Sequence, residues 1–197
     1  MGGVGIVMDI DGNNYHSVNI GDQVWLQENL RVTHYRNGEA IPNILNSSNW
    51  SNLMLGAFCV YQNNNTLATT YGYLYNWYSI TDGRKIAPTG WHVATEADWQ
   101  KLFTYLGGID SAGAKMKEAG LSLWSAPDLG ATNVSGFTAR PGGFRLFNGT
   151  FSELQNSAFF WRADQTSGFY ELKNQTVNVN FSECSRNFGL SVRCVKD

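Results

Sequence analysis

The sequence contains few charged residues. Asp, Glu, Lys and Arg make up 15% of its 197 residues, compared with about 25% in an average soluble domain. The formal net charge is −2, which gives no reason to expect nucleic acid or an anionic membrane as a partner. Aromatic residues reach 14%, and there are 21 glycines. Low charge combined with many aromatic, Gly, Asn and Ser residues is typical of a loop-rich extracellular protein.

Cysteine and histidine are also scarce, with three of each. No CxxC motif and no zinc-ligand spacing occurs, so the sequence predicts no metal and no cofactor. An odd number of cysteines leaves at least one thiol free or paired with another chain. The sequence does not choose among the three pairings of Cys59, Cys184 and Cys194.

Membrane-spanning and catalytic motifs are missing as well. No run approaches the roughly 20 apolar residues of a membrane span, and the opening MGGVGIVMDIDG lacks the basic start and long apolar stretch of a signal peptide. No GxSxG nucleophile elbow and no Walker loop occurs, and the glycines of RPGGFRLFNG fit turns better than a phosphate-binding loop. We therefore expect no direct membrane insertion and no enzymatic activity.

The first 30 residues predict β-structure. Apolar and alternating runs flank the turn sequence DGNN, and Asp-Gly between such runs is a strong hairpin signal. Asp9, Asp11 and Asn13 have the spacing that starts a calcium loop, but the glutamate of the twelfth position is missing. Turn chemistry explains these three residues without a metal.

One helix is clearly predicted after GWHVA. Thr95 has the position of an N-cap, Asp98 follows at the capping-box spacing, and four apolar residues within 99–106 recur at i, i+3, i+4 and i+7. A glycine pair then ends the helix. A second short helix is predicted over residues 111–119, with Ser111 as its cap. His92, just before the first cap, is expected to have a structural role.

The remaining segments predict strands and long loops. Residues 36–70 are polar, and we expect a long loop that packs on the body through Trp50, Phe58 and Tyr61. The aromatic stretch YGYLYNWYSI predicts core packing, with a sugar-stacking face as the alternative. Short strands separated by Gly and Pro turns follow from residue 121. This order of elements indicates one α+β domain over residues 1–197, with mixed or antiparallel sheets, one or two helices and long loops.

The chain ends on GLSVRCVKD, in which apolar and polar residues alternate. Such alternation is typical of a β-strand, whereas the last residues of a domain are often poorly ordered. We therefore expect the closing segment to be a β-strand.

Several motifs, in order along nearly the whole chain, resemble the Fibrobacter succinogenes major paralogous domain. They are DIDGNNYHSVNIGDQVWLQENLRVTHYRNG, YGYLYNWYSI, APTGWHVATEADWQKL, ATNVSGFTARPGGFR, FFW and GLSVRCVKD. The resemblance implies a C-type-lectin-like fold, related to the formylglycine-generating-enzyme type, in exported or lipid-anchored surface proteins of Bacteroidetes-like bacteria. It therefore implies an extracellular or outer-surface location, with the export signal outside this chain. It also implies that the two chain ends pair in one sheet.

The sequence departs from that family's pattern in two places that concern cysteine. The family often has Cys-Pro before GWHVP, whereas here Ala87 precedes Pro88 and Ala94 replaces the second proline. Cys194 therefore lacks the partner that this pattern would supply. The related formylglycine-type enzymes depend on a cysteine pair in the active cleft, so an enzyme would require Cys184 and Cys194 together in an open cleft. Fold similarity alone does not carry activity.

The tract between FFW and the closing segment departs most from the family. In the family this tract usually consists of small, polar residues, but here many of its positions hold large or charged residues. In this it resembles the variable region of proteins diversified by retroelements. Those proteins share the fold, end in a fixed strand, and act as ligand-binding receptors or adhesins on phage tails or bacterial surfaces, including pilus tips.

We therefore predict that the segment after Trp161 forms an exposed ligand-binding face. Its ligand would be a protein or a glycan on another cell or phage host. No Glu-Pro-Asn or Gln-Pro-Asp triplet occurs, so calcium-dependent sugar binding is not expected. The alternative is a structural cell-surface or pilus assembly domain without its own ligand. The predicted contact residues are Arg162, Asp164, Gln165, Tyr170, Glu171, Lys173, Phe181, Glu183, Arg186 and Phe188.

Overall fold

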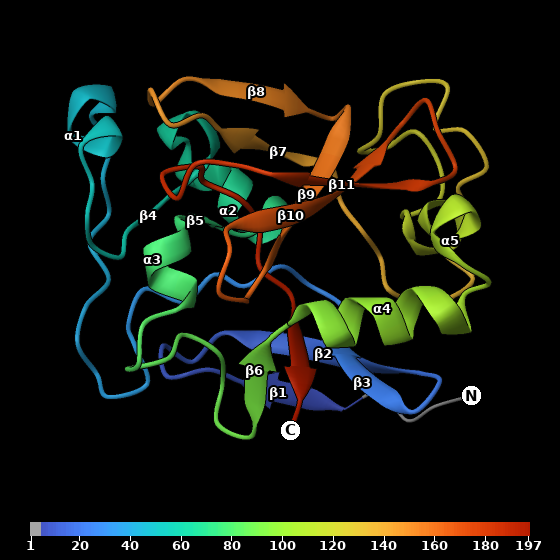
Figure 1. Cartoon of the computed structure of the whole chain (residues 1–197), viewed down its shortest axis with the longest axis horizontal. Coiled ribbons are helices and arrows are strands. Elements are labelled where there is room, and N and C mark those ends of the chain that lie inside the picture. The colour runs from blue at the N-terminus through green and yellow to red at the C-terminus, as the bar shows by residue number, and fades with distance from the viewer. Residues whose placement is uncertain (1–4) are drawn as a thin grey trace.

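The structure, a computed structural model, describes residues 5–197. The first four residues, which belong to the segment predicted not to be a signal peptide, lie outside the described residues. Within 5–197 the chain forms two five-stranded sheets and a small two-stranded one (Figure 1). The strands are mostly antiparallel, and helices are few. The predicted α+β class is confirmed at this level.

The first sheet has the order β1-β2-β3-β12-β6 and the second the order β11-β10-β9-β7-β8. The strands of the first sheet are β1 (Ile6–Met8), β2 (Asn14–Ile20), β3 (Gln23–Leu26), β12 (Cys194–Lys196) and β6 (Trp91–Val93). Those of the second are β11 (Val179–Glu183), β10 (Gly168–Lys173), β9 (Ser157–Arg162), β7 (Gly142–Arg145) and β8 (Phe151–Leu154). The small sheet consists of β4 (Phe58–Cys59) and β5 (Leu74–Tyr75).

The first hairpin, β1–β2, turns at the DGNN sequence as predicted. The carboxylate of Asp9 holds this turn, because it accepts the backbone N–H groups of Asp11 at 3.0 Å and Asn13 at 2.9 Å. It also accepts the hydroxyl of Tyr15 at 2.7 Å. The acidic spacing in this segment is thus used for turn formation.

The closing segment is a core strand. β12 lies between β3 and β6, with Val195 opposite Trp25 on one side and His92 on the other. The side chains of Val192 and Cys194 are fully buried. This confirms that the last strand pairs in one sheet with the N-terminal hairpins.

Arg193 fixes the closing strand to its surroundings from a fully buried position. Its guanidinium donates to the carbonyl oxygens of Leu26, Phe137 and Thr138 at 2.7–2.9 Å, and to the side-chain oxygen of Asn29 at 2.7 Å. Burial lowers the pKa of this group, but an arginine side chain still carries its charge at neutral pH. The closing strand therefore joins β3 to the loop that precedes β7.

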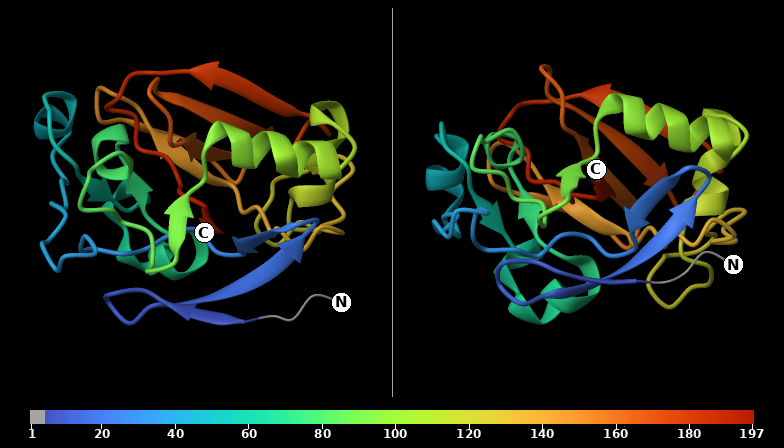
Figure 2. Two further views of the ribbon diagram at one scale, coloured as in Figure 1. Left: turned by 60° about the horizontal axis from the view of Figure 1, so that its bottom comes forward. Right: turned by 90° about the horizontal axis from the view of Figure 1, so that it is seen from below.

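Helix α4 (Glu96–Tyr105) begins with the predicted capping box. The Thr95 side chain accepts the backbone N–H of Asp98, and the Asp98 side chain accepts the backbone N–H of Thr95. Helix α4 lies between the two sheets (Figure 2). Its apolar face is buried there, where Trp99 packs against Trp25 of β3 and Phe160 of β9. The helix thus closes one of the main hydrophobic clusters.

The second helix, α5 (Ile109–Met116), differs from its predicted bounds of 111–119. Its N-cap is Gly108, not Ser111. The helix stops early because Lys117 adopts an extended conformation and pairs with Ala139 in a β-bridge. The Lys117 ammonium is buried and lies 3.2 Å from a carboxylate oxygen of Asp128.

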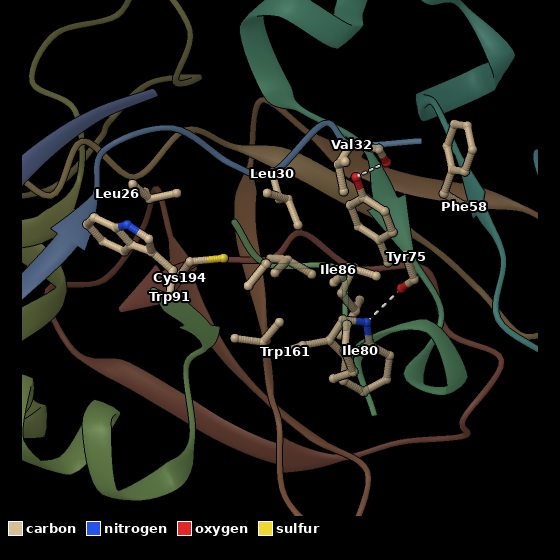
Figure 3. Close-up of a cluster of buried hydrophobic side chains, with 14 of the residues drawn as sticks. Leu26, Leu30, Val32, Phe58, Tyr75, Ile80, Ile86, Trp91, Trp161 and Cys194 are labelled. Carbon is tan, nitrogen blue, oxygen red and sulfur yellow. Dashed lines mark hydrogen bonds between the residues drawn. The ribbon is translucent and has the colours of Figure 1, made fainter. Parts of the chain in front are cut away.

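Residues 36–80 contain more structure than the predicted loop. Trp50, Phe58 and Tyr61 are buried, which confirms that they anchor this region. Tyr75 is also buried, where its hydroxyl donates to the Val32 carbonyl at 2.7 Å (Figure 3). The core interpretation of the aromatic stretch is thus confirmed for Tyr75. The short helices of this region are α1 (Ser47–Ser51), η1 (Tyr61–Asn63), η2 (Asn65–Leu67), α2 (Ala68–Tyr71) and α3 (Trp77–Ile80).

Candidate functional site

Strands β9, β10 and β11 distribute the predicted contact residues over two faces. Tyr170 of β10 lies opposite Phe160 of β9 and Phe181 of β11. Because successive side chains of a strand point to opposite faces, Tyr170 and Phe181 face α4, whereas Phe169 and Glu171 face the other way. The predicted residues therefore do not form one continuous surface.

Tyr170 is a core residue, with only 1% of its surface exposed. Its ring packs against Trp99 at 5.6 Å and Phe103 at 4.9 Å between ring centroids, and its hydroxyl accepts a hydrogen bond from Gln100 at 3.1 Å. The prediction that Tyr170 lies on an exposed contact face is wrong, because α4 covers this face of the sheet.

Arg162 is also buried, with 7% of its surface exposed. It lies 2.7 Å from the Glu96 carboxylate and 3.3 Å from the Asp164 carboxylate, and its guanidinium stacks on the ring of Phe181. Asp164 in turn accepts the backbone N–H of Glu96 at 2.8 Å. These contacts tie the loop after β9 to the start of α4, so the prediction of Arg162 as an exposed contact residue is also wrong.

Four other predicted residues are exposed but come from separate segments. Gln165 lies in the connection between β9 and β10, and Phe181 and Glu183 lie on the edge strand β11. Arg186 follows β11 and stacks on the ring of Trp77 at 4.4 Å. Their contact with a ligand stays a prediction.

The opposite face of the second sheet contains an open depression of about 410 Å³. We call it the aromatic depression. It brings together the predicted residues Glu171 and Lys173 with the phenyl rings of Phe144, Phe159 and Phe169. Its polar lining includes Glu153, Asn156 and Gln175.

The phenyl rings at the aromatic depression belong to a continuous row across the sheet. The ring centroids of Phe169 and Phe159 are 5.5 Å apart, those of Phe159 and Phe144 are 4.7 Å apart, and Phe188 stacks parallel on Phe144 at 5.8 Å. Phe147, which is 52% exposed, continues the row from Phe188 at 6.2 Å. Contacts between rings at these separations stabilise their positions, so the row is a preformed apolar surface.

The charged side chains of the aromatic depression differ in their pairing. Lys173 places its ammonium 3.3 Å from the carboxylate of Glu171, whose side chain is mostly buried. Glu153 is exposed and forms no ion pair among residues 5–197. It has a positive φ of 65° opposite Gly143, which also has a positive φ. This uncommon backbone conformation for a non-glycine residue accompanies a side chain that lines the aromatic depression.

Among the residues that line the aromatic depression, only Glu171 and Lys173 were predicted from the sequence as contact residues. Several residues of the row and of the aromatic depression precede the segment after Trp161, from which the contact residues were predicted. They are Phe144, Phe147, Phe159 and Glu153. The sequence stretches GGFRLF and FFW already contain the rings, but their proximity depends on the parallel pairing of β7 with β9. No local sequence pattern predicts that two strands far apart in the chain pair in this way.

None of the three cysteines forms a disulfide. Burial raises the pKa of Cys59, Cys184 and Cys194 to about 12, so the thiols are protonated at neutral pH. Cys194 has no exposed surface. It therefore does not line the open cleft that a catalytic cysteine pair with Cys184 would require.

His92 bridges two carboxylates, as expected for a structural histidine. Its Nδ1 lies 2.8 Å from Asp197 and its Nε2 lies 3.0 Å from Asp98. Partial burial disfavours the charged ring, but the hydrogen bonds to both carboxylates outweigh it, and the pKa of His92 is raised. The part of the chain described by the structure contains no group of three or more His, Cys, Asp or Glu residues arranged to hold a metal ion. It also contains no helix long and apolar enough to cross a membrane.

These features define an α+β protein with a core-built closing strand and an open aromatic depression on its second sheet. The model of the Fibrobacter succinogenes major domain family matches residues 18–196 of the chain. The chain belongs to this family. No curated protein and no solved structure matched the chain.

Proposed function

We propose that this chain is a non-enzymatic recognition module that binds its ligand in the aromatic depression. The observation that carries the proposal is the row of phenyl rings beside a solvent-open hollow of about 410 Å³. Concave sites lined by aromatic side chains with a few polar groups are typical ligand sites. Glu171 and Lys173, both predicted as contact residues, lie in the hollow.

We further propose that the chain has a C-type-lectin-like fold and acts as a surface-exposed adhesin or receptor-binding module. Two features support it: the closing strand pairs with the N-terminal sheet, and the tract just before it carries exposed charged and aromatic side chains. A retroelement-diversified tract after Trp161 is part of the same proposal. A reverse transcriptase gene beside a near-repeat of that tract in the neighbouring DNA is the observation expected for it.

The proposal is tested with a glycan microarray and a phage-displayed random peptide library, each probed with the whole chain. Phe169→Ser removes a ring that lines the aromatic depression, and we expect it to abolish the binding that the wild type shows. Tyr105→Ser is the control, because Tyr105 is a 64% exposed aromatic residue of α4 that lies outside the aromatic depression and outside the predicted contact residues. It should leave that binding unchanged.

Thermal unfolding of each variant separates loss of a contact from loss of the fold. The proposal requires that Phe169→Ser unfolds cooperatively and within a few degrees of Tyr105→Ser. Equal binding by both variants, or no binder from either collection, contradicts a ligand site at the aromatic depression.

A structural assembly domain is the second candidate, and the edge strand β1 favours it. In β1, Ile6 and Met8 are 70% and 67% exposed, and Ile10 in the following turn is 50% exposed. Among residues 5–197, β1 pairs with β2 alone. An apolar edge strand is a template for pairing with another chain. This candidate predicts that the chain associates in sedimentation experiments and that Met8→Lys makes it monomeric; a wild-type chain that is monomeric at all concentrations contradicts it.

A further inference from the structure

The aromatic depression has an unbalanced charge. Its ionisable lining groups are two carboxylates, Glu153 and Glu171, and one ammonium, Lys173. Lys173 neutralises Glu171 at 3.3 Å, and Asn180 donates a further, long hydrogen bond of 3.5 Å to the same carboxylate. One negative charge, that of Glu153, is left without an intramolecular cation among the ion pairs of residues 5–197.

The apolar part of the lining consists of phenyl rings. Phe144 and Phe169 present partly exposed rings, and the buried ring of Phe159 supports both of them. A phenyl ring has no hydroxyl or indole N–H, so these residues donate no hydrogen bond to a ligand. A phenyl face attracts a cation as well as apolar groups. A carboxylate beside such rings therefore suits a ligand that combines a positive charge with hydrophobic surface.

Most of the backbone beneath the aromatic depression is already paired. β10 is hydrogen-bonded to β9 on one side and to β11 on the other, and β9 also pairs with β7, whereas β8, which carries Glu153, is an edge strand. A ligand over β9 and β10 cannot add a strand between them. It must be recognised by side chains, through shape, apolar contact and charge.

We propose that the ligand of the aromatic depression is a protein segment that carries a lysine or arginine next to an apolar residue. The lysine or arginine of the ligand forms an ion pair with the carboxylate of Glu153, and its apolar neighbour packs on the rings of Phe144 and Phe169. This inference rests on the proposed function and narrows it from any ligand to a basic, apolar peptide. Charge complementarity of this kind contributes specificity more than raw affinity.

The test uses three acetylated and amidated hexapeptides with fluorescent labels, titrated with the whole chain. The first is Ala-Leu-Phe-Lys-Leu-Ala, the second has Glu in place of Lys, and the third has Ser in place of Leu and Phe. We expect the first to bind about tenfold more tightly than either of the others. Raising the salt concentration should reduce this preference, because exposed charges are screened.

Substitutions at Glu153 test the assignment of the charge without removing any apolar contact. Glu153→Gln should weaken binding of the lysine peptide about two- to fivefold, as for a rim-exposed ion pair. Glu153→Lys should reverse the preference in favour of the glutamate peptide. Asp22→Asn makes the same carboxylate-to-amide change at an exposed turn position between β2 and β3, away from the predicted contact residues, and should leave all affinities unchanged.

The outcomes separate this inference from the proposed function. If the lysine and glutamate peptides bind equally, or if Glu153→Gln has no larger effect than Asp22→Asn, the charge assignment is overturned while the site stands. If only glycans bind, and Phe169→Ser abolishes that binding, the site stands but its ligand is not a peptide. If Phe169→Ser leaves all binding unchanged, both fail.

Discussion

The closing segment, residues 189–197, and the tract before it, residues 162–188, have similar alternating sequences but different environments. In the closing segment, Arg193 is enclosed and bonded to carbonyl oxygens of distant elements. In the tract, Arg186 is exposed and stacks on a single ring. Arg193 directly precedes β12, which lies between two strands, whereas Arg186 lies in the connection that follows the edge strand β11. Position within a sheet, more than residue type, decides which arginine is structural.

The largest effect is expected from breaking the closing segment itself. Arg193→Met leaves three buried carbonyl oxygens and the Asn29 side chain without their donor, which should cost on the order of 3–5 kcal/mol of unfolding free energy. Urea unfolding followed by tryptophan fluorescence measures this. Lys196→Met, an exposed position on the same strand, should change stability by less than about 0.5 kcal/mol. Equal effects of the two substitutions would contradict the role assigned to Arg193.

The next comparison lies within the tract, between two aromatic residues that are paired across β10 and β11. Tyr170→Ala removes a buried ring that packs on α4 and should cost about 3–5 kcal/mol. Phe181→Ala removes a ring that is 43% exposed and should cost about 1 kcal/mol. The difference in urea midpoint between the two variants is the measurement. A Phe181→Ala variant that is as unstable as Tyr170→Ala would show that β11 belongs to the core.

The smallest effect concerns the pH dependence of His92. Its pKa is higher in the folded state than in the unfolded one, so its ion pairs stabilise the fold fully below pH of about 6.5 and lose that contribution as pH rises through the folded pKa. Asp98 has a lowered pKa, because hydrogen bonds from Thr95 and His92 outweigh its burial. Its contribution is present above the unfolded value of 3.8 and disappears in acid.

The melting temperatures of wild type and His92→Asn between pH 5 and pH 9 measure this effect. We expect a difference at pH 5.5 that corresponds to no more than about 1 kcal/mol, since the pair is partly exposed, and a smaller difference at pH 8.5. A difference that grows with pH would contradict the assigned direction.

Much of the fold was predictable because its signals are local. The Asp-Gly hairpin, the capping box at Thr95 and the alternation of the closing segment each depend on a few neighbouring residues. The end of α5 was not predictable, because Lys117 leaves the helix to reach Asp128, Ala139 and other partners far along the chain. Tertiary contacts override helix propensity at such positions.

The candidate site was predictable only in part. Glu171 and Lys173 follow from the unusual composition of their tract. The exposure of Tyr170 was predicted wrongly, because a strand has two faces and the sequence did not indicate which face α4 covers. Phe144 and Phe159 were missed, because the parallel contact between β7 and β9 brings together residues that no sequence spacing connects.

The division between an enclosed closing strand and an open tract is tested most directly by hydrogen–deuterium exchange of the whole chain. The backbone amides of Cys194 and Val195 should exchange only through global unfolding, whereas those of Gln165 and Arg186 should exchange within seconds, because exposed loop amides open readily. If the amides of the closing strand exchange as fast as those of the tract, the strand is not the fixed support described here, and the account of the site beside it is contradicted.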